Sequence, residues 1–146
     1  MDLTWIDEYV SGVIDYCYSQ DIFEIYNTLN INIERIDKDD YLLQGNEALY
    51  IRNYFGLETV FIKDDLPYKY EKFILAHELG HALLHTEIAK AAYNSKLING
   101  GKLEKQADYF ALKLLDIKID EDLYEGYTLE QLAHGFYVTE ESLYYV

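Results

Sequence analysis

The sequence is built around the stretch from Phe73 to His85, which reads FILAHELGHALLH. Its apolar residues fall on nearly every side of a helix, which predicts a helix in the core. On such a helix His77 and His81 lie one turn apart on the same face, the spacing at which two imidazoles share a metal ion. Buried imidazoles and a buried acid need polar partners, and one ion supplies a partner for all of them.

Glu78 completes the pattern H-E-x-x-H in this stretch. Beside the first histidine it is placed next to the ion rather than on it, where it can take a proton from an activated water and pass it to a leaving amine. The alternative is a buried helix whose histidines make ordinary hydrogen bonds. Gly80 costs about 1 kcal/mol relative to Ala inside a helix, so we expect another segment to pack closely there.

A second helix is predicted from Leu103 to Leu115, and it offers the third protein ligand that a metal held by two histidines needs. Glu104 is the best candidate. Asp108 lies one turn further on the same face, where its carboxylate can accept the second N–H of a ligand histidine. The alternative for both acids is a solvated charged face. The apolar side of this helix consists of Leu103, Ala107, Phe110, Ala111, Leu114 and Leu115.

His85 competes with Glu104 for the third position, and we reject it. It lies eight residues beyond His77, about 12 Å along the helix axis, which is too far for both to reach one ion with His81 between them. We expect His85 instead at the helix C-terminus, where a histidine meets the negative end of the helix dipole.

These two segments together resemble the ImmA/IrrE family of metallopeptidases, which is common in bacteria, prophages and mobile elements. The resemblance covers about residues 30 to 145 and implies one zinc ion held by His77, His81 and Glu104, with Glu78 as general base and acid. It further implies site-specific cleavage of a helix-turn-helix repressor of a phage or mobile element. The matching residues are His77-Glu-Leu-Gly-His81-Ala-Leu-Leu-His85 and Glu104-x-x-Ala107-Asp108-x-Phe110-Ala111-x-x-Leu114-Leu115.

Length and composition predict a single metallopeptidase domain over residues 1–146. Half of the residues are hydrophobic, which argues against disorder. Cys17 is the lone cysteine, which rules out an intramolecular disulfide and fits a reducing compartment. The sequence contains neither a signal-peptide pattern nor an apolar run long enough to cross a membrane. We therefore expect a cytoplasmic protein with no membrane partner.

The formal net charge of −15 opposes binding to phosphate backbones, so we expect no direct contact with nucleic acid. An acidic surface favours a basic partner, and DNA-binding repressors are often basic. Acidic surfaces also simply keep proteins in solution.

The predicted fold class is α+β, in which a small antiparallel, possibly mixed, sheet packs against the H-E-x-x-H helix and the second ligand-bearing helix. Residues 1–29 are expected to form one helix, or two that divide around 19–21, and residues 30–66 the sheet, with turns at 45–46 and 53–56. Residues 67–118 carry the metal-site helices, with Pro67 near the start of the first. Residues 86–102 read as a connection between these helices, and 119–146 as C-terminal helices.

An exposed edge strand of this sheet beside the ion could hold an extended peptide by backbone hydrogen bonds; the alternative is that the strand is internal. Near the C-terminus Thr128 and Thr139 are expected to cap two short helices, with Gln131 completing a capping box. This pair resembles a helix-turn-helix but lacks Lys and Arg, so we expect packing rather than DNA reading. His134 is expected to be a surface or structural residue.

The sequence thus predicts a zinc-dependent endopeptidase acting on a protein substrate. The first alternative is a binding module that keeps the metal and sequesters a repressor without cutting it. The intact Glu78 disfavours that alternative, because a pure binder needs no base beside the ion. Hydrolysis of a non-peptide amide is a third reading, since the same chemistry serves it. The sixteen tyrosines are too many to single out an oxyanion-stabilising residue.

Overall fold

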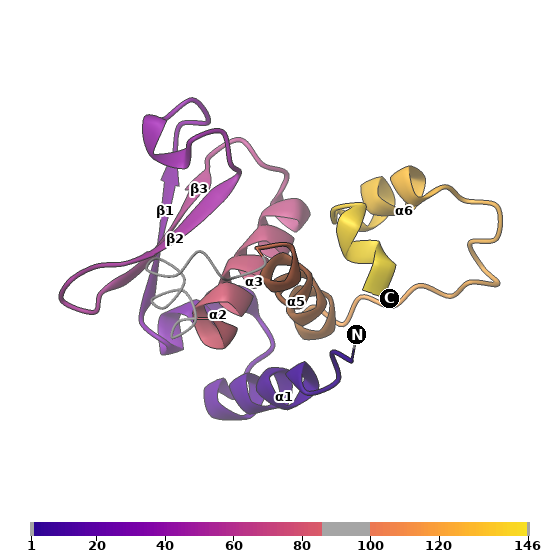
Figure 1. The fold of residues 1–146 in the computed structure, drawn as a ribbon, viewed down its shortest axis with the longest axis horizontal. Helices are drawn as coiled ribbons and strands as arrows, with labels where there is room; N and C mark the ends of the chain where they lie inside the picture. The colour runs from indigo at the N-terminus through magenta and orange to yellow at the C-terminus, as the bar shows by residue number, and fades with distance from the viewer. Residues whose placement is uncertain (1, 86–99, 146) are drawn as a thin grey trace.

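The computed structural model describes residues 2–85 and 100–145, and it has the expected α+β class. Helix α3 lies at the centre, with the sheet on one side of it and α5 on the other (Figure 1). Helix α1 packs below against α5, and the C-terminal elements lie beyond α5 (Figure 1). The prediction of one domain over residues 1–146 stays a prediction.

The N-terminal segment forms two helices, α1 (Ile6–Cys17) and α2 (Ile22–Thr28). Helix α1 ends because Tyr18 adopts the left-handed conformation, with φ 52°. Helix α2 begins because the Asp21 carboxylate accepts hydrogen bonds from the backbone N–H groups of Phe23 and Glu24, both at 3.0 Å. Of the two possibilities for residues 1–29, the structure has the pair of helices.

The sheet has three strands, β1 (Ile31–Ile36), β2 (Ala48–Arg52) and β3 (Glu58–Lys63), in the order β1-β3-β2. Strand β3 runs antiparallel to β2 but parallel to β1, so the sheet is mixed. A single 3₁₀ turn, Tyr41–Leu43, lies between β1 and β2. The β2–β3 hairpin closes at the predicted turn, where the Asn53 side chain accepts from the N–H groups of Phe55 and Leu57, both at 2.9 Å.

Helices α3 (Tyr68–Leu84) and α5 (Gly100–Leu114) form the centre of the core, and Pro67 is the N-cap residue of α3. They approach closely at Gly80, where an added Cβ would lie 3.2 Å from the Cα of Ala107 and 3.2 Å from Cδ1 of Phe110. The close packing expected at this glycine is therefore confirmed. Most of the predicted connection 86–102 lies outside the described residues, and its last part, 100–102, belongs to α5.

The C-terminal part contains α6 (Leu129–Phe136) and the 3₁₀ helix η2 (Glu141–Tyr145). The capping box predicted for Thr128 and Gln131 is present, with both of its hydrogen bonds. The second expected short helix is present as this 3₁₀ helix, and Thr139 Oγ1 accepts a hydrogen bond from the Ser142 N–H at 3.3 Å. Ser142 Oγ donates to the Thr139 carbonyl at 2.7 Å, so this side chain competes for a carbonyl at the start of the turn.

The chain segment between α5 and α6 loops away from the core (Figure 1). Within residues 2–85 and 100–145, the structure has no helix that is long and apolar enough to cross a membrane.

Candidate metal centre

Three side chains from two helices converge in the centre of the molecule. The Nε2 atoms of His77 and His81, on α3, lie 3.2 Å apart. The Glu104 carboxylate, on α5, places one oxygen 3.0 Å from His77 Nε2 and the other 2.9 Å from His81 Nε2. The structure thus brings together the three residues that the sequence suggested as ligands.

This arrangement has the composition and size of a zinc site. Two imidazole nitrogens and one carboxylate oxygen are ligands that zinc prefers, and one ligand atom from each residue lies within 4.8 Å of the other two. Ligand atoms about 2.0–2.1 Å from a tetrahedral zinc ion lie about 3.4 Å from one another, close to the distances found here. The two histidines are largely buried, whereas the Glu104 side chain is 60% exposed, which leaves one side accessible. The residues therefore fit the metal that the sequence implied.

Asp108 lies behind His77, with its Oδ1 2.8 Å from His77 Nδ1. Burial lowers the pKa of His77, but the hydrogen bonds to Asp108 and Glu104 outweigh it and raise that pKa to about 10. The same contacts to His77 and His81 hold the pKa of Glu104 well below its usual range. Because Asp108 accepts the Nδ1–H of His77, the Nε2 atom of His77 faces the point between the three converging side chains of His77, His81 and Glu104. We call this point the shared position.

Glu78 lies beside this cluster. Burial raises its pKa, and the nearby His77 and His81 rings oppose that rise. The backbone N–H of Tyr50, on β2, is close enough to lower this pKa slightly. A carboxylate with a raised pKa that is held beside the shared position is suited to accept and return a proton.

His85 is the C-cap residue of α3, as expected from its place in the sequence, and it is only 2% exposed. Its ring contacts His81 rather than the shared position: the two Nδ1 atoms lie 3.0 Å apart, and His85 Nε2 lies 2.8 Å from Gln106 Oε1. Burial lowers the pKa of His85, so the ring is kept neutral. His85 thus lies at the helix C-terminus as expected, and there its ring is buried and hydrogen-bonded.

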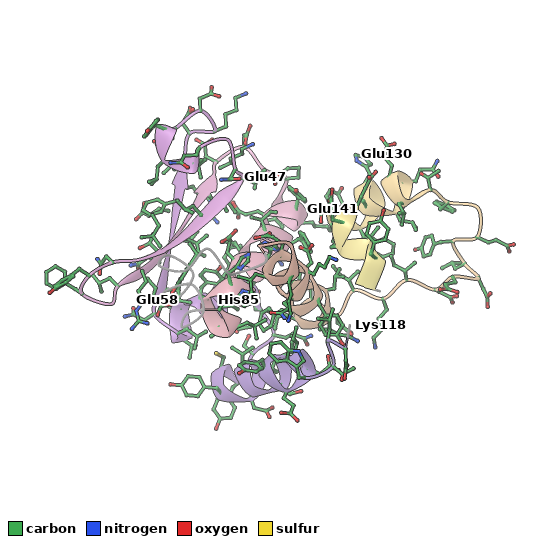
Figure 2. All side chains as sticks on the ribbon, viewed as in Figure 1. Glu47, Glu58, His85, Lys118, Glu130 and Glu141 are labelled. Carbon is green, nitrogen blue, oxygen red and sulfur yellow. The ribbon has the colours of Figure 1, made fainter. Side chains whose placement is uncertain are left out.

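The cluster opens into a cleft of about 1680 Å³ between the sheet and the two central helices. Strand β2 and its hairpin form one wall, and Leu103 and Glu104 of α5 lie on the other side. Glu47 and Glu141 line the cleft, and Figure 2 labels Glu47 near the sheet and Glu141 near the C-terminal elements. Figure 2 also labels Glu58, on β3, and His85, both away from the C-terminal elements.

Strand β2 is the edge of the sheet on the cleft side. Two backbone hydrogen bonds, from Lys63 to Glu47 and from Asn53 to Leu57, mark the two ends of its ladder with β3. Because these bonds alternate along an antiparallel pair, the backbone groups of Ala48, Tyr50 and Arg52 point away from β3. The edge strand expected from the sequence is thus β2, and the alternative of an internal strand does not hold.

Two features of the site were missed by sequence reasoning. The proximity of the Tyr50 backbone to Glu78 brings together segments far apart in the chain, and no local pattern signals it. The contact between His81 and His85 has a signal, since the two residues are four apart on one helix, but His85 was considered only as a ligand or as a residue at the helix C-terminus. His134 is exposed on α6, in agreement with the surface role expected of it.

Comparison with known proteins agrees with this geometry. Residues 28–145 match the family model described as the IrrE N-terminal-like domain, which is a peptidase family. The chain belongs to this metallopeptidase family. It is 32% identical over 135 residues to the metallopeptidase ImmA of Bacillus subtilis (strain 168), an alignment that covers 88% of this chain and 76% of that protein. No solved structure gives a significant match.

Membership accounts for the resemblance noted from His77 to Leu115, because the matched range includes both central helices and the sheet. Helix α1 lies outside the range matched by the family model. The family assignment and the α3–α5 geometry thus rest on the same part of the chain.

Proposed function

We propose that this metallopeptidase is a zinc-dependent endopeptidase, with His77, His81 and Glu104 as the zinc ligands and Glu78 as the general base. The observation that carries the proposal is the convergence of Nε2, Nε2 and a carboxylate oxygen within 4.8 Å, with the half-buried Glu78 carboxylate beside them. Asp108 is proposed to orient His77 through the contact at 2.8 Å.

When bound, zinc would polarise the peptide carbonyl and make a water molecule more acidic. Glu78 then accepts a proton from that water on its carboxylate and delivers it to the leaving amide nitrogen. The raised pKa of Glu78 favours both steps, because this pKa lies closer to neutral pH than the pKa of an exposed glutamate does.

A polypeptide substrate is supported by the size of the cleft and by its wall. The cleft of about 1680 Å³ exceeds the roughly 300–1,000 Å³ typical of small-molecule pockets. The outward-facing backbone groups of β2 can pair with an extended peptide, which would lie beside Glu78 because β2 and Glu78 line the same cleft. An unfolded or extended segment of a protein is therefore the proposed substrate form.

The charge of the cleft supports a basic partner. The described residues that line it include five carboxylates, those of Glu47, Glu78, Glu104, Asp108 and Glu141, but only one Lys or Arg side chain, Arg52. The whole chain has a formal net charge of −15. We propose a DNA-binding repressor of a phage or mobile element as the substrate, cut in the cytoplasm, because such proteins carry basic segments.

The test is to incubate the purified, zinc-loaded protein with the helix-turn-helix repressor of the same genetic element and to look for discrete fragments by mass spectrometry. Glu78→Gln should lower the cleavage rate at least about 100-fold, since it removes the proton acceptor. The zinc content of this variant should stay at one ion per chain, because Glu78 is not a proposed ligand. His134→Ala, at an exposed histidine outside the cleft, is the matched control and should cut at the wild-type rate.

Fragments that form equally fast with Glu78→Gln would overturn the proposed role of this residue. A wild-type protein that holds zinc and binds the repressor without cutting it would favour the non-proteolytic binding module instead. A wild-type protein that retains no divalent ion would remove the basis of both.

A further inference from the structure

Both histidines of the metal site have a hydrogen-bond partner on the ring nitrogen that faces away from the site. For His77 this partner is Asp108, at 2.8 Å. For His81 it is another histidine: His81 Nδ1 lies 3.0 Å from His85 Nδ1, and His85 Nε2 lies 2.8 Å from Gln106 Oε1. His85 and Gln106 are 2% and 6% exposed, so this second chain of contacts is shielded from water.

The positions of the protons in this series of hydrogen bonds follow from the group at its end, the Gln106 amide. Gln106 Oε1 is an acceptor, so His85 Nε2 carries the hydrogen. A neutral imidazole then has its lone pair on Nδ1, which accepts the Nδ1–H of His81. His81 is left with a lone pair on Nε2, the atom that faces Glu104 and His77.

The opposite direction of the same chain would disable the site. If the Gln106 amide were turned so that its nitrogen donated to His85 Nε2, each proton would move to the other end of its ring. His81 would then carry a hydrogen on Nε2, which blocks coordination of a cation. One orientation of a buried amide thus decides whether His81 can act as a ligand.

We propose that His85, held by Gln106, is a positioning residue of the metal site that keeps the His81 proton on Nδ1 and so leaves Nε2 free for the ion. This inference rests on the metal ligands named under the proposed function. His85 is not itself a ligand, because both of its ring nitrogens are engaged elsewhere.

The two supporting contacts differ in charge. Asp108 behind His77 is a carboxylate, whereas His85 behind His81 is a neutral ring that is in turn held by a neutral amide. A charged acceptor makes a ligand imidazole more basic than a neutral one does. Replacing Gln106 with glutamate therefore strengthens the acceptor at the end of the chain without moving any ligand.

The first experiment measures the zinc dissociation constant by competition with a chelator of known affinity. His85→Phe keeps a ring of similar size but removes the acceptor, and it should weaken zinc binding about 10- to 100-fold. Gln106→Leu should also weaken it, whereas Gln106→Glu should bind zinc at least as tightly as the wild type. His134→Phe, on the exposed face of α6, is the matched control and should bind as the wild type does.

The second experiment separates this role from a merely structural one. Nitrogen-15 NMR of the histidine rings in the zinc-loaded wild type should show hydrogen on Nδ1 of His81 and on Nε2 of His85. Thermal unfolding of each variant without metal shows whether it folds, and the NMR assignment needs no variant at all.

Zinc binding by His85→Phe that equals the wild type, or a His85 ring protonated on Nδ1 in the zinc-loaded protein, would overturn the inference. Failure of the wild type to bind zinc would instead overturn the proposed function on which it rests. The two failures are therefore distinguishable.

Discussion

The imidazole of His77 has a strongly perturbed proton affinity. Burial lowers its pKa, but the hydrogen bonds to Asp108 and Glu104 raise the net value from 6.5 to about 10. A group whose pKa is raised by folding stabilises the folded state fully at pH values below the unfolded pKa. That contribution is lost as the pH rises through the folded pKa, so the window here is about pH 6.5 to 10.

The metal-free protein should therefore lose stability between pH 6.5 and 10, by at most about 1.4 kcal/mol for each pH unit. Urea unfolding at several pH values in the presence of a chelator measures this fall. Asp108→Asn removes the charged partner of His77 and should flatten the dependence. A wild-type unfolding free energy that stays constant over this range would contradict the assigned pKa.

A second charged pair ties the sheet to the central helix. Arg35, on β1, donates from Nε and from a terminal nitrogen to the two carboxylate oxygens of Glu71, on α3, at 2.9 and 2.8 Å. Glu71 is 6% exposed, whereas the Arg35 side chain is 47% exposed. The carboxylate is thus the partner that depends on the contact.

Arg35→Met should lower the free energy of unfolding by about 1–3 kcal/mol, because it leaves the buried Glu71 carboxylate without its two donors. The double variant Arg35→Met with Glu71→Leu should recover part of the loss, since it buries no charge. Denaturant unfolding of the single and double variants decides between these outcomes. A double variant less stable than Arg35→Met would show that the carboxylate has other important partners.

At the scale of elements, the contact between α3 and α5 sets the position of Glu104 relative to the two histidines. Gly80→Ala would bring a methyl group to 3.2 Å from the Cα of Ala107, so the helices must separate slightly. We expect an overpacking cost of about 1–3 kcal/mol, which exceeds the gain of about 1 kcal/mol in helix propensity.

Gly12→Ala is the control for this change, because no heavy atom outside its own helix surroundings lies within 4 Å of the added methyl group on α1. It should raise stability by about 0.5–1 kcal/mol. Thermal unfolding of both variants, together with zinc affinity, measures the two effects. Equal stabilisation by both substitutions would mean that α5 can move away from position 80 without any loss in the free energy of unfolding.

The central helices were predictable because their signals are local. The i, i+4 spacing of His77 and His81 and of Glu104 and Asp108 defines two polar faces on otherwise apolar segments. Gly80 indicated that another segment packs closely against this helix, but it did not indicate which segment. Long-range geometry alone showed that Ala107 and Phe110 fill this role.

The strand directions were only partly predictable. The β2–β3 hairpin follows from the turn at Asn53–Gly56, where Gly56 has a positive φ of 80°. The parallel pairing of β1 with β3, which sets Ile31 opposite Glu58, depends on the path of the chain around β2. Alternation of apolar residues defines which face of a strand is buried, but it is the same for both directions.

At the scale of the whole molecule, an ion bound by the three proposed ligands would bridge α3 and α5. Zinc at a free concentration about 1,000 times its dissociation constant should raise the unfolding free energy by about 4 kcal/mol. Thermal unfolding with zinc and with a chelator measures the difference. Glu104→Gln should reduce the effect of zinc, while His134→Ala should keep it; an effect of zinc that persists undiminished in Glu104→Gln would place the ion elsewhere.

The division of the three metal-site residues between two helices has a consequence during synthesis. A nascent chain that has left the ribosome only as far as His85 already holds both histidines of α3 but lacks the carboxylate of α5. Under the proposed ligand set, the hydrolytic centre is completed only after Glu104 has emerged and α5 has packed against Gly80 through Ala107 and Phe110. The enzyme would thus stay inactive towards neighbouring proteins until α5 has been synthesised and has folded.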